Sequence, residues 1–188
     1  MKLWVGQTVS LFGSALSRLA IPLIAALMLD ATAADMGILA AVGTAPDLLI
    51  GLFAGVWVDR FKRRNIMIVG DIGRALLQLT IPLAALMGLL TMFHLYLVAF
   101  LSGIFSIFFG VASRSYLPSV VDHSQLVEAN GKLELSGSIT AVAGPSLAGV
   151  IIQAITAPVA IIFDAVSYLV SAFSIYLIRH REAAPQTS

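Results

Sequence analysis

Six apolar stretches, each long enough to cross a lipid bilayer as a helix, constrain this chain more than any other feature. A helix needs about 20 apolar residues to span the hydrocarbon core, and short polar or proline-bearing breaks separate stretches of that length here. Only 11% of the residues are charged, against roughly 25% in a soluble domain. We therefore predict an all-α integral membrane protein, with one bundle over residues 1–180 and a polar tail over residues 181–188. The predicted spans are residues 3–28, 36–58, 65–90, 95–113, 135–155 and 159–178.

The cations of the chain gather on one side of a six-span topology. Lys and Arg residues are retained on the cytoplasmic side of a membrane, so both termini are predicted to be cytoplasmic in a multi-pass protein of the inner (plasma) membrane. The cations on this side are Lys2, Arg60, Lys62, Arg63, Arg64, Arg114, Lys132, Arg179 and Arg181. The opposite loops contain Asp30, Asp35 and His94, but no Lys or Arg.

A cleaved signal peptide is the alternative interpretation of the first span. The sequence Ala31-Thr32-Ala33 resembles a cleavage site. The apolar stretch before it is longer than the core of a signal peptide, and Arg18 interrupts it.

Several classes of function are excluded by what the sequence lacks. A net charge of +1 provides no basic excess for binding nucleic acid. The chain contains no cysteine, and its histidines, His94, His123 and His180, are scattered, so no metal site is predicted. Because no nucleophile, base and orienting group converge at one depth, and no phosphate-binding glycine loop is present, we expect neither an enzyme nor a cofactor.

Small and polar residues recur at helical spacing inside the spans. Such stripes face other helices or water in a membrane protein. They are Gln7, Ser10, Ser14 and Ser17 in the first span, Ser102, Ser106 and Ser113 in the fourth, and Asp164, Ser167, Ser171 and Ser174 in the sixth. Tight packing and a polar cavity are both open interpretations of the serines, whereas the Gly51-x-x-x-Gly55 spacing favours close helix packing.

Charged residues inside the spans are more informative, because a charge at the centre of a membrane helix costs roughly 2.5–3.5 kcal/mol on insertion scales. Arg18 and Asp47 lie at similar depth in consecutive antiparallel spans, which predicts an ion pair. That pair could be a titrating midplane site or a static packing element. Asp71 and Arg74, one turn apart near the cytoplasmic end of the third span, are interpreted as a structural pair joined to the basic loop. Asp164 is interpreted as a proton-titrating group or a residue in a wet cavity.

The second of the breaks carries a family resemblance. The stretch Gly55-Val56-Trp57-Val58-Asp59-Arg60-Phe61-Lys62-Arg63-Arg64 resembles motif A of the major facilitator superfamily, with Lys62 in place of a glycine. The matching residues are Gly55, Asp59, Arg60, Arg63 and Arg64. The resemblance implies a cytoplasmic gate, and a carboxylate at a helix end beside arginines can hold one alternating-access state until the contact breaks.

The fifth span agrees with this resemblance. Residues 143–149 resemble motif C of the antiporters in the superfamily, with Gly144, Pro145 and Gly149 forming a bend in the helix. Residues 114–118 and 126–130 look like the loop between the fourth and fifth spans in the branch that contains macrolide and siderophore exporters.

The resemblance implies half of a major facilitator fold, a 3+3 inverted repeat, because the transporters of the superfamily have about twelve spans in two halves. The expected function is proton-coupled efflux of a small amphipathic compound by alternating access. The expected partners are the bilayer, the substrate, protons, and a missing carboxyl-terminal half or a second copy. The alternatives are a truncated inactive half-transporter and a non-transporting six-span assembly or regulatory protein.

Each candidate site residue has an expected role under this hypothesis. Asp47 and Asp164 are the candidates for proton coupling, because both are carboxyl groups inside the predicted spans. The candidates for lining the substrate cavity are Gln7, Ser14, Arg18 and Ser106.

Overall fold

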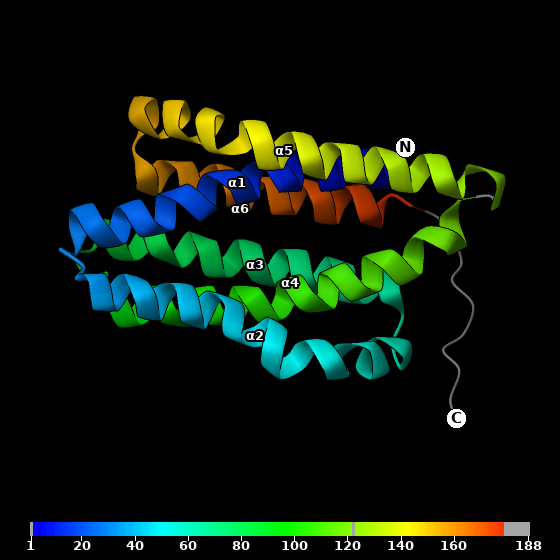
Figure 1. Cartoon of the computed structure of the whole chain (residues 1–188), viewed down its shortest axis with the longest axis horizontal. Coiled ribbons are helices and arrows are strands. Elements are labelled where there is room, and N and C mark those ends of the chain that lie inside the picture. Colours follow the sequence, from blue (N-terminus) through cyan, green and yellow to red (C-terminus); the bar gives the residue numbers. More distant parts are fainter. Residues whose placement is uncertain (1, 122, 179–188) are drawn as a thin grey trace.

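The computed structural model describes residues 2–121 and 123–178, and in this part of the chain six long helices are joined by short connections (Figure 1). The helices are α1 (Lys2–Met28), α2 (Ala33–Asp59), α3 (Arg63–Leu86), α4 (Met92–Val120), α5 (Leu126–Ile155) and α6 (Ala157–Tyr176), with a short 3₁₀ helix η1 (His123–Gln125) before α5. All six are long and apolar enough to cross a membrane, which confirms the predicted six-span architecture. The predicted tail over residues 181–188 lies outside the described residues, together with Arg179 and His180.

The connection between the fourth and fifth spans differs from the expectation of a long polar loop over residues 114–134. Helix α4 continues to Val120, and α5 begins at Leu126. Counting apolar residues underestimates these helices, because a helix can continue with polar residues beyond the hydrocarbon core. The first turns of α5 are supported by an ion pair one turn apart, with 2.6 Å between Lys132 Nζ and Glu128 Oε1.

The helices pack as two three-helix groups that share one pattern of contacts. Helix α1 packs on α5 and α6, α4 packs on α2 and α3, and the two groups meet mainly where α3 packs on α6. Exchanging α1 with α4, α2 with α5 and α3 with α6 leaves this pattern unchanged. Because exchanged helices run in opposite directions (Figure 1), the packing confirms the predicted inverted repeat.

Two opposite ends of the bundle are distinguished by charge. We call the end with the α2–α3 and α4–α5 connections the basic end, because Arg60, Lys62, Arg63, Arg64 and Lys132 lie there. Helix α1 begins at this end too (Figure 1). At the opposite end, Thr32 caps α2 through a reciprocal contact with Asp35.

Apolar side chains form separate clusters toward the two ends of the bundle. Ala20, Ile24 and Ile161 belong to the cluster nearer the opposite end, while Val58 and Met67 belong to the one at the basic end. Most of the buried polar side chains of α1, α3 and α6 lie at depths between these clusters. A small third apolar cluster, Ala75, Ala165 and Tyr168, lies at the depth of these polar side chains, so the middle of the core is mixed and its two ends are apolar.

Candidate functional site

A set of polar side chains from α1, α3 and α6 meets in the interior of the bundle. We call this set the buried polar network; its members are Ser14, Ser17, Asp71, Arg74, Gln78, Asp164, Ser167 and Tyr168. Three of the six helices contribute to it because their polar stripes face one another where α1 packs on α6 and α6 packs on α3. The stripes predicted from the sequence on the first and sixth spans therefore meet a third stripe on α3.

Asp164 of α6 is at the centre of one part of the network. Its side chain is fully buried, and Gln78 Nε2 donates to Asp164 Oδ2 over 3.3 Å. Ser17 Oγ donates to the side-chain oxygen of Gln78, Oε1, over 3.4 Å. Ser167 Oγ lies 3.3 Å from Asp164 Oδ1. Asp164 forms no ion pair within the described residues, so neutral donors surround this buried carboxyl.

Arg74 of α3 occupies the second part of the network. It forms an ion pair with Asp71, and both side chains are buried. The guanidinium lies between two aromatic rings, 4.3 Å from the centre of Tyr168 and 4.5 Å from the centre of Phe109. Such stacking favours a desolvated cation. The predicted pairing of Asp71 with Arg74 is therefore confirmed. The expected link to the basic loop is not seen among the described contacts, because the pair lies deep in the bundle between α3, α4 and α6.

Two contacts join this region to α1 and α4. Ser14 Oγ of α1 lies 2.9 Å from Tyr168 Oη. Helix α1 therefore contacts the hydroxyl of Tyr168, whose ring stacks on the guanidinium of Arg74. Arg74 Nη1 lies 3.5 Å from Ser106 Oγ of α4. Of the predicted cavity residues, Ser14 thus belongs to the buried polar network and Ser106 contacts it.

A glycine in α1 makes the close packing of this region possible. A methyl group added at Gly13 would lie 2.1 Å from Ser167 Oγ and 2.8 Å from Asp164 Oδ1. No side chain fits in that space, so α1 approaches α6 at the position of the network. By contrast, a methyl group at Gly51 or Gly55 would contact no described atom within 4 Å, and the predicted close approach through this glycine pair is absent from the described chain.

The predicted ion pair between Arg18 and Asp47 is not formed in the described part of the chain. Both side chains are exposed, and Arg18 Nε lies 3.5 Å from the Ser14 carbonyl of its own helix. The reason is that α1 packs on α5 and α6 whereas α2 packs on α4. Helices α1 and α2 are consecutive in sequence but do not pack on each other, so equal depth did not imply contact.

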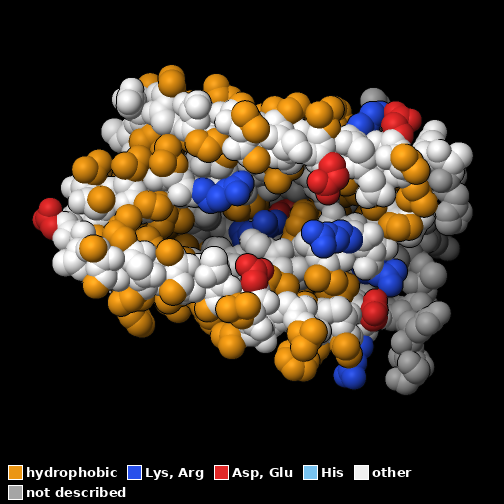
Figure 2. All heavy atoms as spheres, in the orientation of Figure 1, with side chains coloured by type: hydrophobic (Ala, Val, Ile, Leu, Met, Phe, Trp, Pro, Cys, Tyr) orange, Lys and Arg blue, Asp and Glu red, His pale blue; other side chains and the backbone are white. Residues whose placement is uncertain are grey.

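Several charged side chains lie on the face of the bundle that Figure 2 shows. Figure 2 shows them along the middle of this face, in and beside a hollow between α1 and α5 on one side and α2 and α4 on the other. Each of these four helices carries an exposed charged residue within its length: Arg18, Asp47, Arg114 and Glu134. Gln7, the remaining predicted cavity residue, is buried, and its amide donates to Ser113 Oγ of α4.

The residues that match the gate motif lie at the basic end and make several different contacts. Arg63 Nη2 lies 3.3 Å from Asp59 Oδ1. Arg64 reaches the end of α6, where it donates to the carbonyl of Tyr176 over 2.7 Å and to that of Ile175 over 3.3 Å. Arg60 follows the last residue of α2 and is exposed. The motif therefore joins the turn between α2 and α3 to α6.

The residues predicted to form a bend, Gly144, Pro145 and Gly149, lie on α5, which packs on α1. Helix α5 is assigned without interruption through Pro145. A methyl group at Gly144 would lie 3.0 Å from Ala15 Cβ, while one at Gly149 would lie 3.9 Å from Leu19 Cδ2. Gly144 thus allows close contact between α5 and α1.

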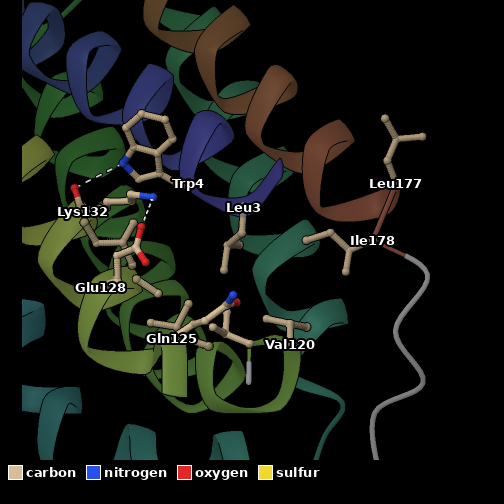
Figure 3. A pocket seen from close by; sticks show the side chains of 12 residues that line it. Leu3, Trp4, Val120, Gln125, Glu128, Lys132, Leu177 and Ile178 are labelled. Atoms are coloured by element: carbon tan, nitrogen blue, oxygen red, sulfur yellow. Dashed lines mark hydrogen bonds and ion pairs between the residues drawn. The ribbon is translucent and has the colours of Figure 1, made fainter. Parts of the chain in front are cut away.

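Two cavities lie at the basic end, away from the buried polar network. The larger, about 770 Å³, is enclosed by the start of α1, the α4–α5 connection and the end of α6. Figure 3 shows Trp4 donating to the Lys132 carbonyl beside the Lys132–Glu128 ion pair. The smaller, about 550 Å³, lies between α2, α3 and α4. None of the four predicted cavity residues lines either of these two cavities in the described chain.

Several residues of the network were not found from the sequence. Gln78 and Tyr168 are single polar side chains in apolar surroundings, and only a polar stripe on the third span, Asp71, Arg74 and Gln78, could have indicated their role. Gly13 gave no signal apart from its position between Ser10 and Ser14. Among the described residues no group of His, Asp and Glu side chains is arranged to hold a metal ion.

Comparison with known proteins places this architecture among transporters. The profile of the Major Facilitator Superfamily matches residues 3–188. The uncharacterized MFS-type transporter YfiS of Bacillus subtilis (strain 168) is 26% identical over 178 residues, which make up 95% of this chain and 42% of that protein. Macrolide efflux protein A of Streptococcus pyogenes is 25% identical over 177 residues, or 94% of this chain and 44% of that protein.

The chain thus spans less than half the length of these curated relatives. No solved structure gives a significant match.

Proposed function

The chain belongs to the Major Facilitator Superfamily, and we propose that it is the amino-terminal half of a secondary transporter that exports a small amphipathic compound in exchange for protons. The observation that carries this proposal is the charged face of the bundle (Figure 2). Charges facing lipid are costly, so charged residues in membrane proteins face the bundle interior or a water-filled cavity. A second half facing α1, α2, α4 and α5 would enclose such a cavity.

The length of the relatives supports this arrangement, since they are more than twice as long as the matched region. The macrolide efflux protein among them supports an amphipathic substrate of that class. In this proposal Arg18 and Ser106 line the cavity directly, while Ser14 and Gln7 position the helices behind it. Gly144, Pro145 and Gly149 let α5 move against α1.

We assign the basic end to the cytoplasmic side of the plasma membrane, because Lys and Arg are retained on that side. Both termini are then cytoplasmic. The gate consists of Gly55, Asp59, Arg60, Arg63 and Arg64 at this end. Breaking the exposed contact between Asp59 and Arg63 costs little free energy. This is expected for an interaction that forms in one alternating-access state and opens in the other.

Two carboxyl groups are proposed to couple transport to protons. Asp47 is exposed on the helix beside the hollow. Asp164 is buried in the network without an ion pair among the described residues. A carboxylate taken out of water is costly unless it is paired or protonated, so a proton on Asp164 would stabilise one state of the network relative to another.

The proposal is tested by flux of a radiolabelled macrolide into inverted membrane vesicles that contain the complete transporter. We expect accumulation that depends on an imposed pH gradient, and loss of this dependence with Asp47→Asn. Asp59→Asn should insert normally and slow the flux by up to about fivefold, since an exposed ion pair contributes roughly 0.2–1 kcal/mol. Equal accumulation with and without the gradient would exclude proton coupling, and binding without flux would favour the non-transporting alternative.

A further inference from the structure

A groove lined by aromatic side chains lies on the bundle near the basic end. It has a volume of about 550 Å³ and is formed by the end of α2, the start of α3 and the middle of α4. Helix α2 packs extensively on α4 and little on α3, which leaves this space open. The rings of Trp57 and Phe108 lie 6.5 Å apart, and the other aromatic residues that line the groove are Phe61 and Phe105.

Two exposed cations, Arg60 and Lys62, lie at the rim of the aromatic groove. Neither forms an ion pair within the described residues, whereas their neighbour Arg63 is paired with Asp59. Helix α3 begins at the same rim, so the positive end of its dipole adds to the field of the cations. The side chain of Asn65 supplies a polar group between them and the groove. The rim is therefore suited to an anionic group.

An apolar stripe on α3 leads from the aromatic groove toward the opposite end of the bundle. Its exposed side chains are Val69, Ile72, Leu76 and Leu83, at successive spacings of three, four and seven residues that place them on one helix face. Val69 also lines the groove. The stripe extends for about 21 Å at 1.5 Å per residue, and one leaflet of hydrocarbon is about 15 Å thick. An acyl chain that begins in the groove can follow it.

We propose that the aromatic groove binds one anionic phospholipid from the leaflet at the basic end. The phosphate lies between Arg60 and Lys62, the Asn65 amide donates to it, and an acyl chain lies on the aromatic side chains and the stripe of α3. A free anion would gain nothing from the apolar lining. A zwitterionic headgroup would bring an amine to a rim whose carboxylate, Asp59, is already paired. This inference requires a membrane-spanning chain and is independent of the proposed transport.

The chain contains its own reporter for this site. It has two tryptophans; Trp57 lines the groove, while Trp4 lines the other cavity. In the Trp4→Phe variant of the full chain, Trp57 is the only tryptophan. We would reconstitute this variant in phosphatidylcholine vesicles that contain increasing fractions of phosphatidylglycerol with brominated acyl chains, and measure quenching of its fluorescence. Brominated phosphatidylcholine in the same vesicles provides the reference.

We expect brominated phosphatidylglycerol to quench Trp57 at a lower mole fraction than brominated phosphatidylcholine, by about fivefold for each cation in contact with the lipid. Lys62→Gln in the Trp4→Phe background should reduce this preference about fivefold, and a second change, Arg60→Gln, should remove most of the remainder. Arg114→Gln is the matched control, because it removes one exposed cation from a helix position outside the groove. It should leave the preference unchanged.

Three outcomes would overturn the proposal. The first is equal quenching by the two brominated lipids in the Trp4→Phe variant, a measurement that does not depend on the folding of any further variant. The second is the same loss of preference with Arg114→Gln as with Lys62→Gln, which would show a general effect of surface charge. The third is reversal of the quenching by inorganic phosphate, which would show a site for a free anion.

Discussion

Two ion pairs near the first half of α3 contrast in their surroundings. Asp71 and Arg74 retain 0% and 8% of their side-chain exposure, whereas Asp59 and Arg63 retain 67% and 34%. The first pair is enclosed by the rings of Tyr168 and Phe109 and contacts Ser106. The second joins the end of α2 to the first residue of α3. The same kind of interaction thus occurs in a dry interior and at the surface.

The difference indicates separate roles. Water replaces a lost partner at the surface, so an exposed pair can open and close at small cost. Removing one partner of a buried pair leaves a charge without compensation, which makes that pair costly to break. The buried pair therefore fixes the position of α3 against α4 and α6, and the exposed pair is suited to a contact that changes during transport.

The largest effect is expected for Arg74→Ala, which leaves Asp71 buried without its cation. The free energy of unfolding should fall by about 3–5 kcal/mol, measured by denaturation in detergent micelles and followed by circular dichroism. The double variant Asp71→Leu/Arg74→Leu removes both charges and should recover much of this loss. A cost for Arg74→Ala no larger than that of Asp59→Asn would contradict the contrast.

The next effect tests the close approach of α1 and α6 at the network. Gly13→Ala places a methyl group against Ser167 and Asp164, so the helices must separate or the side chains must move. We expect a loss of roughly 1–3 kcal/mol in the same assay. The matched control is Gly37→Ala in α2, where the added methyl group meets no described atom within 4 Å. That control should be neutral or stabilising by up to about 1 kcal/mol, and equal losses in both would refute the packing argument.

A smaller effect is expected for Gln78→Leu. The substitution removes the donor to Asp164 and the acceptor for Ser17, and both contacts are longer than 3.2 Å. We expect a loss of about 1 kcal/mol in the free energy of unfolding. Gln153→Leu, at an exposed position of α5, is the control and should change stability little. If both variants unfold alike, Gln78 is not part of a connected network.

The smallest effect on stability is expected for Asp59→Asn. Its partner Arg63 remains hydrated at the basic end, so the free energy of unfolding should change by less than about 1 kcal/mol. The same variant is expected to slow flux, and this combination separates a gate contact from a folding element. A loss of stability comparable to that of Arg74→Ala would place the exposed pair in the structural core instead.

The sequence was sufficient for the architecture because each membrane helix is specified by its own composition. The six spans, the inverted repeat and the Asp71–Arg74 pair depend on local length and spacing or on the family resemblance, and the structure confirms them. The lengths of α4 and α5 were underestimated. The number of consecutive apolar residues reflects the thickness of the hydrocarbon core, whereas a helix can continue with polar residues beyond that core.

Contacts between helices were less predictable. The Arg18–Asp47 pair was inferred from equal depth, but depth does not specify which helices are neighbours. Gln78 and Tyr168 became functional candidates only when packing brought α3 and α6 together. Tertiary contacts of this kind depend on the arrangement of all six helices, which no single stretch of sequence encodes.

We propose that the buried polar network around Asp164 couples transport to protons, while the exposed pair of Asp59 and Arg63 controls the rate of transport. The most direct test measures the dependence of macrolide flux on an imposed pH gradient in vesicles that contain the complete transporter with Asp164→Asn, beside the same measurement with Asp59→Asn. We predict that Asp164→Asn abolishes the dependence on the gradient and that Asp59→Asn retains it at a lower rate. Retention of the full dependence by Asp164→Asn would contradict the account.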